Sequence, residues 1–457
     1  MGISSLGVGS SILTQDVLDQ LRAADEGSLI TPIDLSLAAE GDKKDALGLI
    51  DATMTNLIDS INEIKSHGLF DERETEVSGT AVEVTAAANS DIQDFTLSVT
   101  TLATKQIEES GAFTSSTELI ANAAGTMNLN IDGQDFTINY DETTTITDLK
   151  NLINDVAGDK VDATIVQINS GEFRLFVSSV DTGTTQDITM TDNSAQLKDA
   201  RVTTEMTAIQ SGVNAAFTFN GQAITRTSNN VDDLIVGLDI TLKEVGTSVV
   251  SVSQNRDNIM DKFDSFVEKY NSAIHELDKM TMASTDSEER GIFSGESTIK
   301  NMKRTIENIV STIGGGVGSI ADYGFEIDKD GVMTLDKDVL NTKLDDDTTN
   351  VEAFFAGGTF DNGDGTTTDV EGAFTEFSVV IEGYTKYNAT LDQFKNSITD
   401  RISSLEDKKV SATERLDAKY EIMAKQYAAY DLMISKINSA SSMFVQMANA
   451  QMAASNN

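Results

Sequence analysis

The C-terminal part of the chain carries a long and regular hydrophobic repeat, called here the C-terminal seam. From Leu416 to Ala448, apolar and aromatic residues recur at alternating intervals of four and three, which is a heptad spacing. This spacing predicts a long helix with one apolar face, and such a face needs a partner helix. Its positions are Leu416, Tyr420, Met423, Tyr427, Tyr430, Ile434, Ile437, Ser441, Phe444 and Ala448. The pattern favours a protein that works through assembly.

The N-terminal part predicts two further helices. The first, from Leu13 to Ala24, is amphipathic and has Thr14 as its N-cap, and Pro32 interrupts the helix beyond it. The second shows another heptad seam and has Gly68 as a C-cap. The positions predicted to face partner helices here are Val17, Leu21, Leu47, Ile50, Met54, Leu57, Ile61 and Ile64.

Helical spacing returns in the second half of the chain. Residues Ile259 to Leu277 repeat at intervals of four and three, and an amphipathic helix is predicted over Thr298–Ile313. Gly324–Asp336 reads as a β-hairpin that turns at Asp330-Gly331. From Phe374 onward everything reads as helix in two stretches, the second being the C-terminal seam.

Between these helical parts, from about residue 77 to 253, the apolar period changes to two, which predicts β-strands. Asn128–Thr137 resembles Ala216–Thr225, and both contain an Asx-Gly turn. Each copy is followed by a stretch that we read as briefly helical, Ile146–Ile153 and Val231–Leu234. The similarity indicates an internal repeat, although two unrelated hairpins on Asx-Gly turns would also look alike.

These elements predict an α+β multidomain fold. The N- and C-terminal segments form a helical stalk or coiled coil, and two small antiparallel β-rich domains are inserted between them. We expect a terminal helical domain of residues 1–40 and 416–457, a stalk domain of 41–76 and 257–415 with a β-hairpin, a β-rich head of 77–118 and 212–256, and an outer head of 119–211. The Leu47–Ile64 and Ile259–Leu277 seams supply partners for the lower stalk, whereas the turns beyond Tyr430 lack a strong counterpart.

Charge and composition exclude several classes of protein. The chain has 457 residues and a net charge of −41, which argues against nucleic-acid binding and against anionic membrane surfaces, and which keeps a protein soluble. No apolar run approaches the ~20 residues of a membrane span. The N-terminus lacks the basic and apolar regions of a Sec signal peptide. We therefore expect no membrane insertion and, if the protein is exported, another route.

The sequence contains no recognisable catalytic constellation. Cysteine is absent, and the two histidines, His67 and His275, lie outside any motif, so a zinc site is not expected. Asp328-Lys-Asp-Gly begins like a calcium loop, but Val332 and Val339 occupy the positions that need Asx and Glu, so a hairpin turn is favoured. We expect no enzymatic activity, no cofactor and no metal.

The order of these elements, together with several motifs, resembles the bacterial flagellar filament-capping proteins, the hook-associated protein 2 family. Ser5-Leu-Gly-Val-Gly-Ser-Ser-Ile-Leu-Thr-Gln-Asp-Val-Leu looks like that family's opening, in the style of ε-proteobacterial members. Asn128–Ala157 is similar to its inserted hook/flagellin motif. Phe266-Val-Glu-Lys-Tyr-Asn, Gly324–Asp336 and Met423-Ala-Lys-Gln-Tyr-Ala-Ala-Tyr also match.

This resemblance implies a structural cap at the distal tip of the flagellar filament, where exported flagellin is retained and helped to fold and insert. It implies a homo-oligomeric ring, often a pentamer, together with flagellin, a hook-associated junction protein and a cytoplasmic export chaperone as partners. The location would be extracellular, reached through type III export without a cleaved Sec signal. The alternatives are another flagellar axial protein, such as a hook–filament junction protein or flagellin, and a tip adhesin that binds host mucus.

Overall fold

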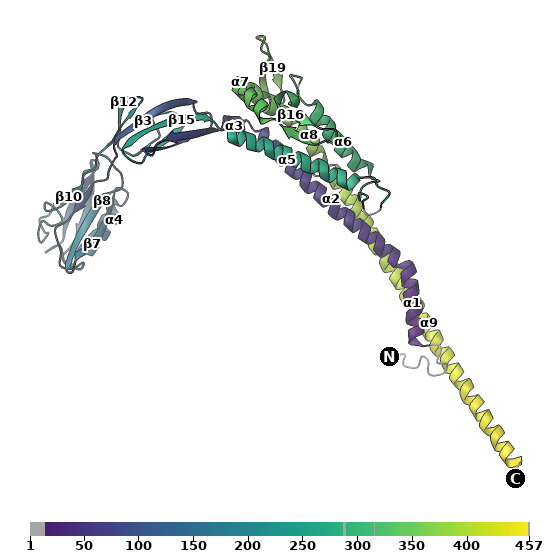
Figure 1. Ribbon diagram of the computed structural model, residues 1–457. Coiled ribbons are helices and arrows are strands. Elements are labelled where there is room, and N and C mark those ends of the chain that lie inside the picture. The colour runs from purple at the N-terminus through teal and green to yellow at the C-terminus, as the bar shows by residue number, and fades with distance from the viewer. Residues whose placement is uncertain (1–13, 287–288, 315, 456–457) are drawn as a thin grey trace. The chain divides into compact units, whose positions relative to one another are not determined.

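The computed structural model describes residues 14–286, 289–314 and 316–455, and the predictions on residues 1–13 lie outside this range (Figure 1). The chain divides into two compact units. One unit combines both ends of the chain, residues 1–67 and 259–457, and the other is residues 68–258. The β-rich segment is thus inserted between two helical segments that fold together.

The unit built from the chain ends is mainly helical. Its helices, including two that cross the unit boundary, are α1 (Gln15–Leu29), α2 (Thr31–Ile64), α3 (His67–Asp71), α5 (Arg256–Thr281), α6 (Ser297–Thr312), α7 (Lys337–Ala356), α8 (Ala373–Thr385), α9 (Thr390–Ser455) and the 3₁₀ turn η1 (Ile320–Tyr323). Two hairpins accompany them, β16–β17 (Phe325–Ile327 and Met333–Leu335) and β18–β19 (Gly358–Asp361 and Thr367–Val370). The predicted hairpin at Asp330-Gly331 is confirmed.

Aromatic side chains form much of the core of this unit. Phe263 and Phe266 on α5 contact Phe374 on α8, with ring centroids 6.1 Å and 4.6 Å apart. Phe355, at the end of α7, lies 4.8 Å from Phe263. Rings in these tilted and edge-on arrangements bury large apolar areas with favourable geometry. The predicted apolar rhythm of α5 is therefore used inside the chain.

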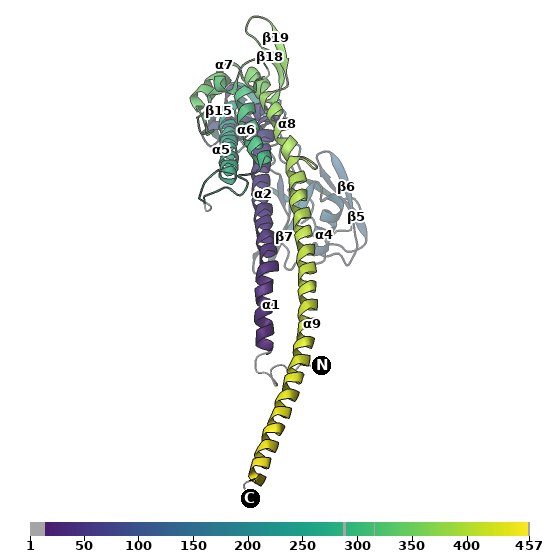
Figure 2. The same ribbon diagram turned by 90° about the vertical axis from the view of Figure 1, so that its right-hand side faces the viewer.

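The N-terminal helices lie beside the long α9, as both ribbon views show (Figure 2). Thr14 caps α1, as predicted, since its hydroxyl accepts from the Val17 N–H at 3.4 Å. Pro32 stands in the first turn of α2, where its missing N–H costs no helical hydrogen bond. The prediction of Gly68 as a C-cap is wrong, because α2 ends at Ile64 and Gly68 lies inside α3.

The predicted division of the C-terminal helices is also wrong. The break falls at residues 386–389, where Asn388 has a left-handed φ of 60°, and α9 then runs on for 66 residues. At about 1.5 Å per residue, this helix is about 100 Å long. The charged stretch before Leu416, which shows no heptad spacing, is helical as well.

The inserted unit is built from short antiparallel strands and one helix. The strands are β1 (Arg73–Ser78), β2 (Val82–Ala86), β3 (Gln93–Thr101), β4 (Ile107–Glu109), β5 (Gly125–Ile131), β6 (Gln134–Tyr140), β7 (Val161–Asn169), β8 (Glu172–Ser179), β9 (Thr189–Asp192), β10 (Thr207–Gln210), β11 (Ala215–Phe219), β12 (Gln222–Arg226), β13 (Asn230–Val231), β14 (Leu238–Leu242) and β15 (Gly246–Gln254). The sheets have the orders β1-β15-β3-β11-β12, β13-β14-β2, β10-β4-β8-β7 and β6-β5-β9.

Two separate hydrophobic clusters form the cores of this unit. One includes Phe95, Leu97 and Phe217, and the other joins the β5–β6 hairpin to the helix α4 (Ile146–Ala157). Tight turns join the sequence-adjacent pairs β5–β6, β7–β8 and β11–β12, whereas most other pairs join strands that are distant in sequence.

The two similar hairpins of the predicted repeat have the same turn chemistry. Asp132-Gly133 and Asn220-Gly221 both adopt positive φ at their two central residues, which matches the twist of the flanking strands. The first copy is followed by α4, as predicted. The helical stretch predicted at Val231–Leu234 is wrong, since β13 and a turn occupy it.

The predicted α+β fold, with helical ends enclosing antiparallel β units, is confirmed. The finer division into four domains, at about residues 40 and 415 in the helical part and 118 and 211 in the β part, stays a prediction.

Candidate assembly surface

The first part of α9 is covered by α2. Leu391 and Ile398 are fully buried, and so are all six predicted seam positions of α2 from Leu47 to Ile64. Arg401 donates to the Glu40 carboxylate at 2.9 Å, and Lys409 pairs with Asp34 at 2.7 Å. This part of the helix therefore has its partner within the chain.

The next turns of α9 are covered by α1. Leu18, which is 3% exposed, forms a small cluster with Leu416 and Tyr420, against which Ile30 and Tyr427 pack. The structure thus assigns the beginning of the C-terminal seam to α1 rather than to the Leu47–Ile64 seam, which lies beside the earlier turns of α9 and beside α8.

A polar layer accompanies that small cluster. Asp25 accepts hydrogen bonds from Lys419 Nζ at 2.6 Å and from the Tyr420 hydroxyl at 2.7 Å. The bond from Lys419 is the main reason that the pKa of Asp25 lies below its usual value. Burial, followed by the hydrogen bond to Asp25, raises the pKa of Tyr420 to about 12. Arg22 adds an ion pair with Asp417. Polar groups at a helix seam fix its register at some cost in stability.

The predicted positions on α1 do not match this contact fully. Val17 is half-buried and Leu21 is 40% exposed, whereas Leu18 makes the buried contact. The sequence does not single out Leu18. Val17 and Leu21 are four residues apart and share one face, and nothing in the local sequence distinguishes Leu18 from Leu21 as the buried leucine. The positions that follow Leu18 at heptad spacing are Arg22 and Asp25, so this face reads as polar in the sequence.

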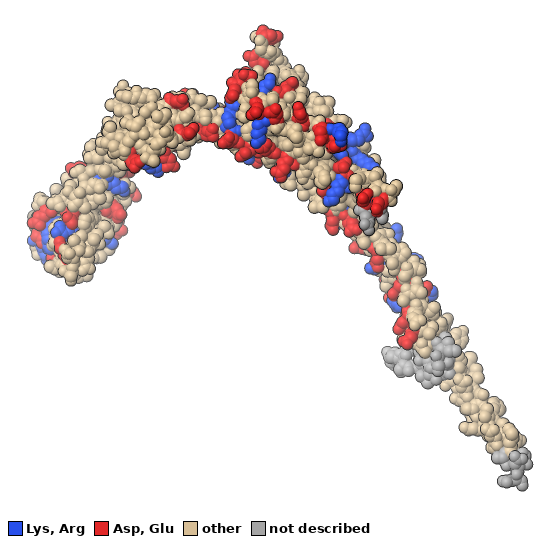
Figure 3. Space-filling model, in the orientation of Figure 1, with Lys and Arg blue, Asp and Glu red and all other residues tan. Residues whose placement is uncertain are grey.

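The far part of α9 exposes most of its apolar side chains, although Asp431 within it is buried. Tyr430, Ile437 and Phe444 of the seam are 57%, 59% and 67% exposed, while Met423, Tyr427 and Ile434 are half-buried. Further exposed apolar residues of this part are Leu432, Met433, Met443, Val445, Met447 and Met452. Only Asp431 and Lys436 are charged between residues 430 and 452. On the face drawn in Figure 3, this part of the helix is almost entirely tan, without the red and blue of charged residues.

Clustered exposure of this kind marks an interaction surface rather than ordinary surface residues. Scattered single apolar residues are normal on soluble proteins, but a contiguous apolar patch is rare. A heptad seam is buried by packing against a helix, so the seam residues that are exposed here can be covered by another helix or another molecule. We call residues 430–452 the bare seam.

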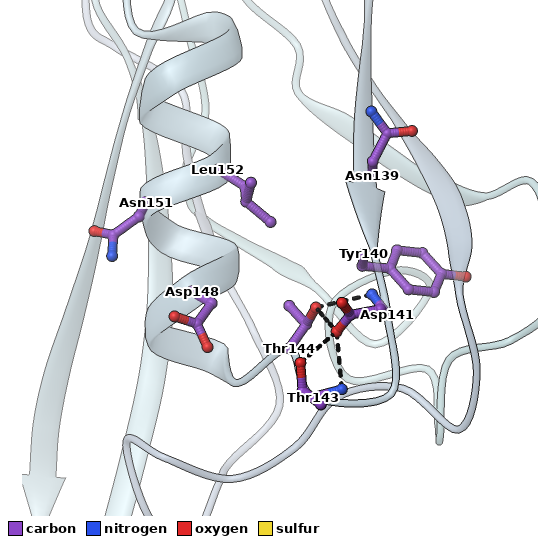
Figure 4. A pocket seen from close by; sticks show the side chains of 8 residues that line it. All are labelled: Asn139, Tyr140, Asp141, Thr143, Thr144, Asp148, Asn151 and Leu152. Atoms are coloured by element: carbon purple, nitrogen blue, oxygen red, sulfur yellow. Dashed lines mark hydrogen bonds between the residues drawn. The ribbon is translucent and has the colours of Figure 1, made fainter.

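A polar cluster at the start of α4 acts in local structure. In the hollow shown in Figure 4, the Asp141 carboxylate accepts from the Thr143 N–H, the Thr143 hydroxyl and the Thr144 hydroxyl at 2.7–3.0 Å. Those bonds, led by the Thr143 hydroxyl, lower the pKa of Asp141, and Asp148 forms a capping box with Thr145. Both carboxylates thus stabilise the turn into α4 and remain ionised, which suits neither a general acid nor a base near neutral pH.

The two histidines take different positions. His67 begins α3, contrary to its predicted place before a helix-ending glycine, and its Nδ1 lies 2.6 Å from a Glu352 oxygen. His275 is exposed on α5. In the described part of the chain, no group of three or more histidine, cysteine and acidic residues is arranged to hold a metal ion, and none of the helices there has the length and apolarity to cross a membrane.

The chain is similar in sequence to known proteins. A 35% identical segment of 238 residues aligns with the flagellar hook-associated protein 2 of Helicobacter pylori, covering 50% of this chain. The chain spans only 35% of the length of that relative. The Escherichia coli K12 flagellar hook-associated protein 2 is 25% identical over 467 aligned positions, which cover 97% of each chain.

A solved structure shows the same fold. The crystal structure of the D1–D2–D3 domains of the flagellar cap protein from Escherichia coli superposes with a TM-score of 0.60 and 23% identity, covering 78% of this chain and 99% of that one. The family model for the N-terminus of flagellar hook-associated protein 2 matches residues 10–106, and the model for its C-terminus matches residues 212–439. Because these two models together match more than half of the sequence, the chain belongs to the flagellar hook-associated protein 2 family.

Proposed function

We propose that this chain is a structural cap at the distal tip of the bacterial flagellar filament, outside the cell, where it retains exported flagellin and promotes its folding and insertion. The names of its relatives and of the structurally similar Escherichia coli protein support this proposal. The single observation from the chain itself that carries it is the bare seam of α9, which exposes apolar residues over about six turns.

The proposal includes the finer partners that the resemblance implies. The cap is a ring of identical subunits, a pentamer, that contacts flagellin and a hook-associated junction protein. A cytoplasmic chaperone covers the exposed apolar helix before export, and the chain leaves the cell through the type III route without a cleaved Sec signal. A chaperone is consistent with the chemistry, because residues such as Ile437 and Phe444 would otherwise promote aggregation.

The mechanism follows from the free energy of burying the bare seam. At about 25 cal/mol per Å² of apolar area, each seam side chain gains roughly 1 kcal/mol on docking, before the entropy cost of ordering is subtracted. Individual contacts of this size are reversible. The helical legs of the cap can therefore leave one site on the filament end and bind the next, as each flagellin subunit inserts beneath the ring.

Truncation of the chain after Ala429 tests this role. That variant keeps the α1 contact at Leu416 and Tyr420 but removes the bare seam. We expect a folded protein that fails to form caps, with flagellin lost to the medium and swimming abolished. The measurements are electron microscopy of filament tips, quantification of secreted flagellin and a swimming assay.

A point-substitution pair separates loss of apolar surface from loss of length. Ile437→Ser with Phe444→Ser removes two exposed apolar groups at seam positions. Ser439→Asn with Gln446→Asn, two exposed polar positions on the same helix, is the matched control. The first pair should impair capping strongly and the second should leave it intact. Normal tips and normal swimming with the truncated chain would remove the basis of the proposal.

A further inference from the structure

A second surface of the helical unit lacks a partner within the chain, on the side of α2 that faces away from its buried seam. We define the outer face of α2 as Leu35, Ala38, Gly41, Asp42, Asp45 and Leu49. Leu35 and Leu49 are 67% and 56% exposed and lie 14 residues apart, which places them at the same heptad position, about 21 Å apart along the helix. A solvent-facing helix surface normally carries long charged side chains at such positions.

The same face is unusually small and acidic. A Cβ added at Gly41 would meet no atom within 4 Å, so no contact inside the chain explains this glycine. Glycine is among the least favourable residues in a helix interior. Asp42 and Asp45 are exposed, and in the described residues neither of them forms an ion pair. The face thus combines two exposed leucines, small residues between them and unpaired negative charge.

A groove with an apolar lining and neighbouring cations lies between α9 and the start of α2, where α1 ends. It has a volume of about 520 Å³, and Leu29, Ile33 and Ala412 provide its apolar lining. Lys408 and Arg415 stand beside it, with one carboxylate, Asp407. Both cations are exposed, and neither is paired with a carboxylate in the part of the chain that the structure describes.

We propose that the outer face of α2 in one copy of this chain docks into the α2–α9 groove of a second copy. Leu35 then meets the apolar lining, and Asp42 and Asp45 meet Lys408 and Arg415, whereas Leu49 lies about 21 Å farther along the helix, beyond the lining. The charge complementarity selects this occupant, because two surfaces of a strongly acidic chain repel each other except where cations of one face carboxylates of the other.

The proposed contact is heterologous, because the face and the groove share no residue. Each copy therefore offers one face and one groove, and repetition of such a contact about an axis closes a ring. This inference deepens the proposed capping function by naming the subunit contact of the ring. Gly41 gains a role as well, since it lets the second copy approach the α2 backbone closely.

Charge exchange in the full-length chain tests the contact. Asp42→Lys with Asp45→Lys, and separately Lys408→Glu with Arg415→Glu, should each weaken self-association at least tenfold in sedimentation velocity. The chain that carries all four substitutions restores opposite charges and should associate again. If the fourfold variant associates no better than its weaker parent pair, or if both pairs associate as the unaltered chain does, the contact is wrong. An unaltered chain that stays monomeric at its highest soluble concentration also overturns it.

A glycine substitution distinguishes docking from a purely structural effect. Gly41→Ala should raise the thermal midpoint of the isolated chain and yet weaken self-association, because its methyl group is free within the chain and crowded in the contact. Gly383→Ala is the matched control, since this exposed glycine of α8 also has open space around it. It should raise the thermal midpoint without affecting association. Equal association of both variants would contradict the proposal.

Failure of this contact and failure of the capping function give different results. A chain that associates through the face and groove but does not cap filaments would keep the inference and refute the function. If the chain caps filaments and its self-association is unchanged by the charge substitutions, the proposed function stands and the inferred contact is wrong.

Discussion

The two ends of α9 carry the same kind of heptad pattern and have opposite environments. Leu391 and Ile398 are buried against the rest of the helical unit, whereas Ile437 and Phe444 are more than half exposed. Between them, Leu416 and Tyr420 are covered by α1 through one buried leucine and a polar layer. The comparison teaches that a heptad pattern predicts the need for a partner helix but does not tell whether that partner lies in the same chain.

The largest expected effect contrasts the two environments directly. Leu57→Ala in α2 should lower the free energy of unfolding by about 2–5 kcal/mol, because it leaves a cavity in a packed core. Ile437→Ala, which removes a side chain that is 59% exposed, should change that free energy by no more than about 0.5 kcal/mol. Urea unfolding of the isolated chain measures both values. A comparable loss for the two variants would show that the bare seam is covered within the chain after all.

The next effect concerns the single buried leucine of α1. Leu18→Ala should weaken the docking of α1 on α9 by about 2 kcal/mol, since this helix has no other fully buried side chain. Amide hydrogen exchange should become faster in α1 and stay unchanged in α2 at Leu47–Ile64. Leu21→Ala, on the exposed neighbour in the same helix, is the control and should have little effect. Exchange that speeds up equally in both helices would show that α1 and α2 unfold as one unit.

Much of the fold follows from the sequence because the signals for helices and hairpins are local. Seam spacing predicts α2, α5 and α9, and Asx-Gly turns predict the hairpins at Asp132-Gly133 and Asn220-Gly221. The errors arise where a local signal is weak or is overridden. Gly68 looks like a C-cap, but the apolar pair Leu69-Phe70 beside it is buried and draws the chain into α3.

The continuity of α9 and the partners of its seam are harder to predict from the sequence than the helices and hairpins themselves. Residues 406–415 lack apolar spacing, yet they are rich in good helix formers and continue the helix. The choice of Leu18 over Leu21 depends on the direction in which α9 lies, which is a property of the tertiary structure. The exposure of the bare seam is likewise a property of the tertiary structure, since the pattern itself does not change at Tyr430.

The smallest expected effect concerns the polar layer between the two ends of the seam, and it depends on pH. The pKa of Asp25 is lower in the folded chain than in the unfolded one, chiefly through the hydrogen bond from Lys419. Its contribution to α1 docking is therefore present above the unfolded-state pKa, near 4, and is lost as the pH falls through the lower folded-state value. Hydrogen exchange in α1, corrected for intrinsic rates, should accelerate below about pH 4.

Asp25→Asn isolates that contribution, because the amide keeps one acceptor for the Tyr420 hydroxyl but cannot titrate. In this variant, α1 should be less protected at neutral pH than in the parent chain, and its protection should change less between neutral and acidic pH. Glu414→Gln, at an exposed position of α9, is the control for general acid effects and should keep the parental profile. If Asp25→Asn keeps that profile too, the polar layer does not hold α1 in register, and Leu18 alone separates the covered part of the seam from the bare one.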